Sequence, residues 1–380
     1  MVKINVDGDA SPAGSTRPPA VRRSQFRQSR VRGRSARRER KAKGGAKRRR
    51  VRLGGWKVWV FGAIGVVVAA IVAAILYGWF QWNQVPHPKD LGVLPAVDNV
   101  ESILIAGTDT RTGISDSDAF GGATEAGSRS DTLMVFVLPP GHAKSTLLSI
   151  PRDLRVDIPG RGQGKINGAL NRGAQTLVDV TQDATGLTIN HYVEVNFDGF
   201  RDLSTAVGGV EICVDHPIRD SFSDLNLDAG CHKLEGDDAL AWVRSRHAEF
   251  FIDGKWVRDP QSDLSRIKRQ QDFLQSMLKA MMSPASLVRF PSIAAAAKKS
   301  FTVDEQFTYW HLLHLSLRFI PSPSSRIIYA TLPVSGQRIG GVDFVVPQQP
   351  QANQLLDALR NGDPPPEDLV NDPSKQESKN

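Results

Sequence analysis

The sequence predicts a layered α/β domain, a mixed β-sheet flanked by helices, that follows a single transmembrane helix. Three observations support this fold class. An uncharged apolar run follows a strongly basic N-terminal segment, strand-like and helix-like patterns alternate through the middle of the chain, and both ends of the 380 residues lack a globular composition. Alternating strands and helices are typical of layered α/β domains.

The N-terminal segment, residues 1–57, carries most of the positive charge. It holds 19 Lys and Arg against three acidic residues, about +16, so the other 323 residues sum to about −8 in a chain of +8. Because it has few apolar residues, we expect a disordered cytoplasmic tail. A topology signal that also contacts anionic lipid is favoured over a nucleic-acid arm, and we expect no nucleic-acid partner.

Residues 58–80, "VWVFGAIGVVVAAIVAAILYGWF", form the predicted transmembrane helix. The 23 residues contain no charge, and Trp56, Trp59, Trp79 and Trp82 stand near the two ends. About 20 apolar residues suffice to cross a bilayer, and tryptophan is typical of its interfaces. No small-residue cleavage site is evident, so a retained anchor is favoured over a signal peptide. The basic flank predicts a cytoplasmic N-terminus and an extracellular domain on a single-pass protein of the cell membrane.

The exported part is divided by composition. Residues 81–100 are expected to form a linker, residues 101–361 the folded extracellular domain, and residues 362–380 a disordered C-terminal tail. Strands are expected over 101–107, 131–138, 145–150, 191–197 and 210–214, with a last strand ending at 344–346. Helices are expected over 167–186, 198–209, 236–246 and 262–283, where apolar residues recur at helical spacing.

The chain contains two cysteines, Cys213 and Cys231, both in the exported part. In an oxidising compartment a disulfide is the expected state, and a free thiol pair or metal site is less favoured. The absence of a C-x-x-C motif or a histidine cluster in the sequence argues against structural zinc.

Two aspartates suggest a metal site. Asp109 follows an apolar strand at its carboxyl end, where open α/β sheets tend to bind ligands, and Asp131 opens the next strand. Adjacent carboxylates need a cation or a proton between them, and Mg²⁺ prefers oxygen ligands together with substrate phosphates. A shared Mg²⁺, or Mn²⁺, is one interpretation; a helix cap or two separate surface acids is the other.

Arginines gather around the same apolar runs. Arg152 ends the strand in "LLSIPRDLRVDIPG", Arg129 precedes Asp131, and the remaining arginines of this group are Arg244, Arg246, Arg266 and Arg269. Guanidinium groups match phosphate oxygens in a bidentate manner, so several of them near a cation favour a pyrophosphate ligand. The sequence lacks a G-x-S-x-G elbow and a G-x-x-x-x-G-K-[ST] loop, which argues against a serine hydrolase and a P-loop nucleotidase.

Seven motifs together resemble those of a known family. They are, in order, "RSDTLM", "LLSIPRDLRVDIPG", "KINGAL", "HYVEVNFDGF", "VGGVEICV", "LEGDDALAWVRSRH" and "DLSRIKRQQDFL". The series resembles the LytR-CpsA-Psr family, actinobacterial type, from about residue 102 to 282. The resemblance implies an α/β enzyme with a deep apolar lipid pocket. Such an enzyme moves an anionic or secondary-wall glycopolymer from a polyprenyl pyrophosphate carrier to peptidoglycan and contacts membrane lipid.

The resemblance also implies roles for particular residues. It assigns Mg²⁺ to Asp109 and Asp131, and it assigns Asp263 to orienting arginines or acting as a base. Pyrophosphate binding falls to Arg129, Arg152, Arg244, Arg246, Arg266 and Gln270. Lys165 and Asn167 are expected close to the site, and Asp153 is expected as a neighbour whose role, catalytic or structural, stays open.

Residues 247–262 form an insertion relative to the family pattern, either a lid or a longer loop. The segment between Asp109 and Asp131 is also longer than in compact members, which leaves the pairing of these aspartates open. Two other functions remain open at this level. A pyrophosphatase would use the same groups with water as acceptor, and a non-catalytic membrane-anchored regulator would act through the basic tail.

Overall fold

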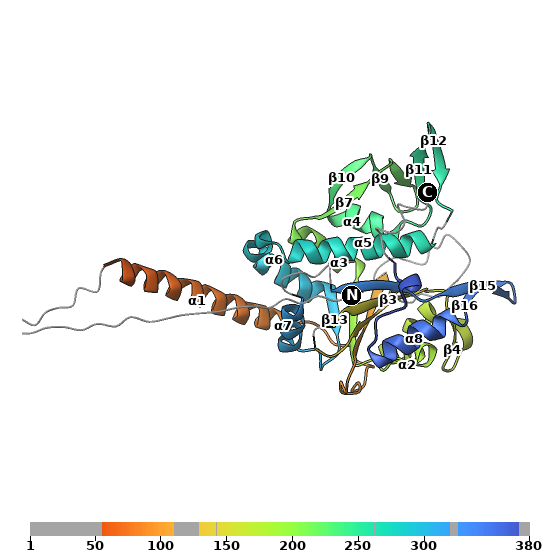
Figure 1. Ribbon diagram of the computed structural model, residues 1–380, viewed down its shortest axis with the longest axis horizontal. Helices are drawn as coiled ribbons and strands as arrows, with labels where there is room; N and C mark the ends of the chain where they lie inside the picture. The colour runs from red at the N-terminus through yellow and green to blue at the C-terminus, as the bar shows by residue number, and fades with distance from the viewer. Residues whose placement is uncertain (1–54, 110–128, 142, 261–262, 320–325, 372–380) are drawn as a thin grey trace, which may run out of the picture. The chain divides into compact units, whose positions relative to one another are not determined.

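The structure, a computed structural model, describes residues 55–109, 129–141, 143–260, 263–319 and 326–371. The basic tail up to residue 54 and the C-terminal residues 372–380 therefore lie outside the described residues. The first helix, α1 (Gly55–Trp82), includes the predicted transmembrane segment (Figure 1). Among the described residues it is the one helix long and apolar enough to cross a membrane, which suits a single-pass membrane protein.

A six-stranded mixed sheet forms the centre of the domain, in the order β13-β6-β1-β2-β3-β14. Strands β1 and β6 are parallel, as are β3 and β14, whereas β2 is antiparallel to both of its neighbours. Strand β13 is antiparallel to β6, so the carboxyl ends of four strands lie at one edge of the sheet, together with the amino ends of β2 and β13. The bounds are β1 (Glu101–Asp109), β2 (Arg129–Leu138), β3 (Ser145–Ile150), β6 (His191–Asn196), β13 (Phe301–Val303) and β14 (Ile327–Thr331).

Both faces of this sheet are covered, which explains its nearly continuous apolar strands. All six residues of β3 are buried, as is typical of strands covered on both sides. One face packs against α2 (Ala174–Thr185) and α8 (Gln351–Asn361) in the largest core cluster. The other face contributes alternate residues, such as Ile103 and Met134, to two smaller clusters. We call the sheet with α2 and α8 the sheet region.

A second core lies in residues 197–300, which we call the helical region. Its buried residues come from helices α3 to α6 and from short strands, and include Leu203, Trp242 and Phe273. Its helices are α3 (Phe197–Val207), α4 (Gly236–Arg244), α5 (Asp263–Met281) and α6 (Pro284–Ser300). Its strands are β7 (Val210–Val214), β8 (Ile218–Asp220), β9 (Leu225–Leu227), β10 (Gly230–Leu234), β11 (Glu249–Ile252) and β12 (Lys255–Arg258). Cys213 and Cys231 face each other on β7 and β10 and form the predicted disulfide.

The remaining elements complete the domain. They are β4 (Arg155–Ile158), β5 (Gly162–Lys165), the 3₁₀ helix η2 (Ile166–Arg172), α7 (Tyr309–Arg318), β15 (Val334–Ile339), β16 (Val342–Pro347) and the 3₁₀ helix η3 (Glu367–Leu369). Strands β4 and β5 form one hairpin, and β15 and β16 form another.

Three expectations need correction. The helix expected over 167–186 is divided into η2 and α2, because Gly173 takes a left-handed φ of 109° between them. The insertion 247–262 contains the hairpin β11–β12, which pairs with β8 and is thus part of a sheet. Residues 362–371, expected in a disordered tail, pack on the domain, since Val370 bridges Ala330 and Asn371 donates to Gln271 Oε1 (3.0 Å).

The linker expected over 81–100 also packs on the domain over part of its length. Val85 and Leu94 are buried in two of the core clusters, and Trp82 Nε1 donates to Phe307 O (3.1 Å). These apolar contacts and this hydrogen bond hold the end of α1 and the chain after it against the domain.

Candidate functional site

The sheet edge at the carboxyl end of β1 brings the predicted aspartates onto neighbouring strands. Asp109 pairs with Arg129 across β1 and β2. The register shifts beside Gly107, which pairs with Thr132 whereas Thr108 pairs with Ser130, so Asp131 is the extra residue of a bulge. Bulges are frequent next to active sites, where they redirect a side chain. The side chains of Asp109, Arg129 and Asp131 lie outside the described part of the structure.

Arg152 belongs to the same edge. Leu133 of β2 pairs with Ile150 of β3 in antiparallel fashion, so Asp131 and Arg152 each lie two residues beyond this pair, on the same side. The turn that follows β3 is held by the backbone: Leu154 N–H donates to Pro151 O (3.0 Å) and Asn167 N–H donates to Arg152 O (3.2 Å). The backbone of Arg152 is therefore fixed from two segments.

Asp153 and Lys165 form an ion pair beside Arg152. Lys165 Nζ lies 2.8 Å from Asp153 Oδ1, whereas Arg152 Nε lies 3.7 Å from Asp153 Oδ2. The backbone of Asp153 accepts a hydrogen bond from Val345 N–H (3.0 Å). Asp153 thus connects β5 and β16 to the turn. These contacts can hold the turn, and whether Asp153 also acts in catalysis stays open. Lys165 and Asn167 both lie beside this turn.

Arg244 reaches this edge from the helical region. Asn196 pairs with Thr108 across β6 and β1, and its side chain caps α3 by accepting from Gly199 N–H (2.7 Å). The next residue, Phe197, has its ring 5.0 Å from the guanidinium carbon of Arg244. Arg244 therefore lies over a residue that directly follows β6, near the end of β1.

Helix α5 connects the two regions. Gln271 Nε2 donates to Ser149 Oγ of β3 (2.8 Å), and Gln270 Nε2 donates to Val243 O near the end of α4 (3.1 Å). Arg266, buried, lies one turn before these glutamines on the same helix. The amide nitrogen of Gln270 thus holds α4 to α5, and its assignment to pyrophosphate stays a prediction. Asp263 begins α5, and its side chain lies outside the described part.

A buried carboxylate, Asp220, fixes the loop containing Arg246, and no sequence pattern predicted it. Asp220 Oδ2 accepts from Ser245 Oγ (2.8 Å), Arg246 N–H (2.8 Å) and His247 N–H (2.7 Å), and Oδ1 accepts from Phe222 N–H (2.9 Å). Burial alone would raise the pKa of Asp220, but these hydrogen bonds outweigh it and hold the pKa below its ordinary value. Asp220 is therefore a charged anchor for the segment after α4.

A second buried contact missed from the sequence joins Arg269 and Asp259. Arg269 Nη1 lies 3.3 Å from Asp259 Oδ2, and Arg269 Nη2 donates to Ser245 O (2.7 Å). Asp259 also accepts from Ser265 Oγ (3.0 Å). Burial lowers the pKa of Arg269, and the hydrogen bond and charge of Asp259 oppose that effect. The pair connects the segment after β12 with α5 and with the loop after α4.

The described parts of the edge carry arginines on three separate segments. The turn after β3 carries Arg152, the end of α4 and the loop after it carry Arg244 and Arg246, and the first half of α5 carries Arg266. Hydrogen bonds from Gln270 and Gln271 join α5 to α4 and to β3. Guanidinium groups on separate elements can contact several phosphate oxygens at once. Asp109 and Asp131 lie on adjacent strands, and their role as Mg²⁺ ligands stays a prediction.

The chain is similar to several known proteins. A family model described as the LytR_cpsA_psr family matches residues 83–361. The probable cell wall biosynthesis protein LcpB of Corynebacterium glutamicum is 37% identical over 241 residues, which cover 61% of this chain and 54% of LcpB. The chain thus spans about half the length of that relative.

Two further proteins match over nearly their whole length. The polyisoprenyl-teichoic acid–peptidoglycan teichoic acid transferase TagU of Halalkalibacterium halodurans is 30% identical over 319 residues, covering 79% of this chain and 96% of TagU. The solved structure of a LytR-Csp2A-Psr enzyme from Actinomyces oris aligns with a TM-score of 0.58 and 27% identity, covering 74% of this chain and 97% of that one.

Proposed function

The chain belongs to the LytR-CpsA-Psr family, and on that premise we propose that it transfers an anionic or secondary-wall glycopolymer from a polyprenyl pyrophosphate carrier to peptidoglycan. The observation that carries the proposal is the sheet edge, where elements bearing Arg152, Arg244, Arg246 and Arg266 meet. The relative TagU bears a name that specifies transfer of polyisoprenyl-linked teichoic acid to peptidoglycan. The same arginines suit the pyrophosphate of such a carrier.

In the proposed reaction the 6-hydroxyl of muramic acid attacks the phosphorus that bears the sugar. The new O–P bond forms as the bond to the bridging oxygen breaks, the hydroxyl loses its proton, and polyprenyl phosphate leaves. The products are a phosphodiester and the lipid phosphate. Asp263 is our candidate for accepting the proton or for orienting arginines, a role that rests on the resemblance.

The arginines would contribute through position and charge. Negative charge grows on the bridging oxygen as the lipid phosphate leaves, and prepositioned cations stabilise that charge without reorganising. The backbone of Arg152 is held by hydrogen bonds from two segments, and Arg246 lies on a loop anchored by Asp220, so both arginines are prepositioned. A Mg²⁺ or Mn²⁺ held by Asp109 and Asp131 would supply further neutralisation of the pyrophosphate oxygens.

We also propose that the domain lies at the outer face of the membrane, with a cytoplasmic N-terminus. The 19 Lys and Arg within residues 1–57 support that orientation. The end of α1 contacts α6 and α7, since a Cβ on Gly78 would lie 2.9 Å from Phe290 and 2.6 Å from the Tyr309 hydroxyl. Leu287, Val288 and Trp310 on these two helices are exposed.

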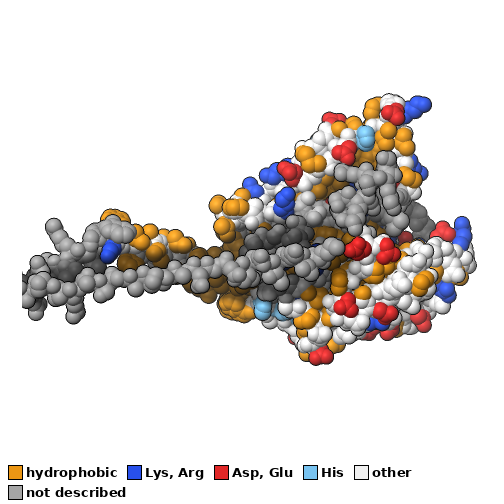
Figure 2. Space-filling model, viewed as in Figure 1, with side chains coloured by type: hydrophobic (Ala, Val, Ile, Leu, Met, Phe, Trp, Pro, Cys, Tyr) orange, Lys and Arg blue, Asp and Glu red, His pale blue; other side chains and the backbone are white. Residues whose placement is uncertain are grey.

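Figure 2 shows apolar side chains at the surface of α1 and of α6. Exposed apolar side chains next to a membrane-spanning helix fit contact with lipid, because they would otherwise face water. Anchoring enzyme and lipid-linked substrate in one membrane raises their effective concentration.

Replacement of Arg152 tests the proposal. The full chain in lipid vesicles is supplied with labelled polyprenyl-pyrophosphate glycopolymer and peptidoglycan oligomers, and the labelled oligomers are quantified. For Arg152→Ala we expect a rate loss of about 10²–10³-fold, as for removal of a prepositioned charge-stabilising donor. Arg155→Ala is the matched control, because Arg155 lies three residues later and its Nε donates to Gln163 on β5 (3.0 Å).

Two results would contradict the proposal. If Arg152→Ala transferred glycopolymer at the wild-type rate, the assigned edge would not be the transfer site. If the wild-type chain released lipid phosphate equally fast without peptidoglycan oligomers, water would be the acceptor and the chain would be a pyrophosphatase.

A further inference from the structure

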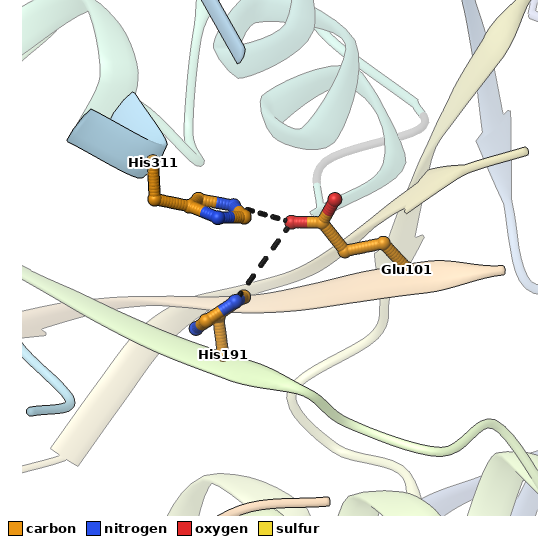
Figure 3. Close-up of side chains that lie close together, drawn as sticks. All are labelled: Glu101, His191 and His311. Carbon is orange, nitrogen blue, oxygen red and sulfur yellow. Dashed lines mark hydrogen bonds and ion pairs between the residues drawn. The ribbon is translucent and has the colours of Figure 1, made fainter. Parts of the chain in front are cut away.

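A cluster of three metal-ligating side chains lies at the opposite end of the central sheet from the arginines. Glu101 is the first residue of β1, His191 is the first residue of β6, and His311 lies on α7. Strands β1 and β6 are parallel and Ile103 pairs with His191, so the two strands bring Glu101 and His191 to the same end. Figure 3 shows that the two imidazole rings and the carboxylate converge from three different elements.

The distances among the ligating atoms are close to those of a coordination site. The three atoms lie within 4.8 Å of one another. His311 Nε2 lies 2.7 Å from Glu101 Oε1, and His191 Nε2 lies 4.0 Å from the same oxygen. Ligands about 2.0–2.1 Å from a tetrahedral Zn²⁺ are about 3.3–3.4 Å apart. To bind Zn²⁺, the distance between His311 Nε2 and Glu101 Oε1 would lengthen by about 0.6 Å. The distance between His191 Nε2 and Glu101 Oε1 would shorten by about 0.6 Å. Side-chain rotation can supply both shifts.

His191 is oriented as metal-binding histidines usually are. Its Nδ1 lies 3.2 Å from Asp304 Oδ2 and 3.3 Å from Asp304 Oδ1, and no hydrogen bond among the described residues engages its Nε2. A proton on Nδ1 shared with Asp304 leaves the Nε2 lone pair directed toward Glu101. A carboxylate that accepts from the remote nitrogen of a histidine is the common supporting contact of metal sites.

Asp304 is itself fixed and buried. It accepts hydrogen bonds from the backbone N–H groups of Tyr192 (2.9 Å), Gln306 (2.9 Å) and Phe307 (3.0 Å). Because these donors belong to β6 and to the turn before α7, Asp304 holds His191 relative to both elements. The orientation of His191 is therefore built into the backbone and does not depend on a mobile surface side chain.

The surroundings leave one side of the cluster open. His191 and Glu101 side chains are 8% and 15% exposed, whereas that of His311 is 29% exposed. The Phe307 ring lies 5.2 Å from each imidazole ring and shields the apolar side, and Trp82 at the end of α1 lies 6.0 Å from Phe307. Three protein ligands with access for one water on the side of His311 match a four-coordinate site.

We propose that Glu101, His191 and His311 bind a divalent transition metal ion, with Zn²⁺ the best fit and water as the fourth ligand. Two imidazoles and one carboxylate favour Zn²⁺ over Mg²⁺ and Ca²⁺, which prefer all-oxygen sites. The ion would replace the proton between His311 and Glu101 and would join β1, β6 and α7 beside the attachment of α1. The site is separate from the arginine edge.

Zinc titration of the full chain tests the proposal. The protein is purified in detergent without a polyhistidine tag and stripped with EDTA. It is then titrated with Zn²⁺ in excess Mg²⁺, which keeps oxygen-only sites occupied. We expect one Zn²⁺ per chain, a raised Tm, and a tetrahedral ligand-field spectrum when Co²⁺ is substituted. Glu101→Gln and His311→Ala should each weaken Zn²⁺ binding by at least the 10–100-fold seen when a supporting contact is removed.

His314→Ala is the matched control, because His314 is an exposed histidine on the same helix. It should bind Zn²⁺ as the wild type does. Glu101→Gln tests whether weaker Zn²⁺ binding results from misfolding. Because glutamine can still accept a hydrogen bond from His311, the Tm of this variant in EDTA should stay near that of the metal-free wild type. The proposal is overturned if the wild type binds no Zn²⁺, or if Glu101→Gln and His311→Ala bind it as tightly as the wild type. Neither result depends on glycopolymer transfer.

Discussion

The sheet region and the helical region position their arginines by different means. Arg152 follows a strand whose six residues are all buried, and backbone hydrogen bonds fix the turn that carries it. Arg246 instead lies on a loop held by a buried carboxylate, Asp220, and by a buried arginine, Arg269. Strand register determines the first position, and a network of charged hydrogen bonds determines the second.

This difference predicts which substitutions destabilise each half of the site. Removing one member of a buried charged network leaves its partner uncompensated in a low-dielectric interior. We therefore expect the helical region to lose stability through single polar substitutions. Equivalent polar substitutions beside Arg152 should have little effect.

Arg269→Ala should give the largest effect. The side chains of Arg269 and Asp259 are 7% and 5% exposed, and breaking a buried ion pair from one side costs about 3–5 kcal/mol. The substitution also removes the donor to Ser245 O. We expect that loss in the free energy of unfolding of the full chain in detergent, together with loss of transfer, measured by denaturant titration and by the labelled-oligomer assay.

Lys279→Ala serves as the matched control, since Lys279 is an exposed cation on the same helix. Surface substitutions usually stay within about 0.5 kcal/mol. Equal stability of Arg269→Ala and Lys279→Ala would show that the buried pair does not hold the helical region together.

Removing the disulfide should have the next largest effect. Cys213 and Cys231 are separated by 18 residues, and closing a loop of that size stabilises a fold by about 3 kcal/mol. We expect the Cys213→Ser/Cys231→Ser double variant to lose about that much, with faster hydrogen exchange in β7 and β10 and unchanged exchange in β3. Faster exchange in β3 as well would mean that the two regions unfold together, and the comparison between them would fail.

Much of the sheet region could be predicted from the sequence. Apolar runs placed β3 at its observed bounds, and the position of Arg152 after β3 followed from that pattern. In the helical region, an apolar run placed β7 at its observed bounds as well. The division at Gly173 was missed, because helical periodicity continues on both sides of a single residue with a left-handed φ. The packing of Asn371 was missed too, since its polar contacts to Gln271 and Thr331 leave no apolar pattern.

The arginine-rich edge was predicted in part. Motifs identified Arg152, Arg244, Arg246 and Arg266. Asp220 ends the three-residue strand β8 and Asp259 lies in a short loop, so neither stands in a periodic pattern that would have marked it as buried. The cluster of Glu101, His191 and His311 was missed for a related reason. Its members are up to 210 residues apart in sequence, and only the parallel pairing of β1 with β6 brings two of them together.

Asp220→Asn should have an intermediate effect that depends on pH. The pKa of Asp220 is lower in the folded chain than in the unfolded chain, so the charged carboxylate stabilises the fold above the unfolded pKa of about 3.9. That contribution disappears as pH falls through the lower folded pKa. We expect the variant to be less stable by about 2 kcal/mol at pH 7, since hydrogen bonds to a charged group contribute about 1.5–3 kcal/mol.

Unfolding of wild type and Asp220→Asn measured from pH 7 to pH 3 checks this expectation. The difference should be constant above about pH 5 and should shrink below about pH 4. A difference that persisted unchanged at pH 3 would assign the loss to packing, and the charged anchor in the helical region would no longer explain the position of Arg246.

Asp153→Asn should have the smallest effect, although Asp153 is adjacent to Arg152. Its ion pair with Lys165 is partly exposed, at 27% and 32% for the two side chains, and such pairs typically contribute about 0.2–1 kcal/mol. The turn keeps its backbone hydrogen bonds, including the one from Val345 N–H to Asp153 O. We expect stability within about 1 kcal/mol of wild type and a transfer rate within about fivefold of it.

The comparison with Arg152→Ala makes this prediction decisive, because the two residues share one turn. If Asp153→Asn unfolded as the wild type does but lost as much transfer as Arg152→Ala, Asp153 would act on the substrate and not only on the turn. Strand register would then be insufficient to position the sheet side of the site. A carboxylate would be needed there too, as Asp220 is in the helical region.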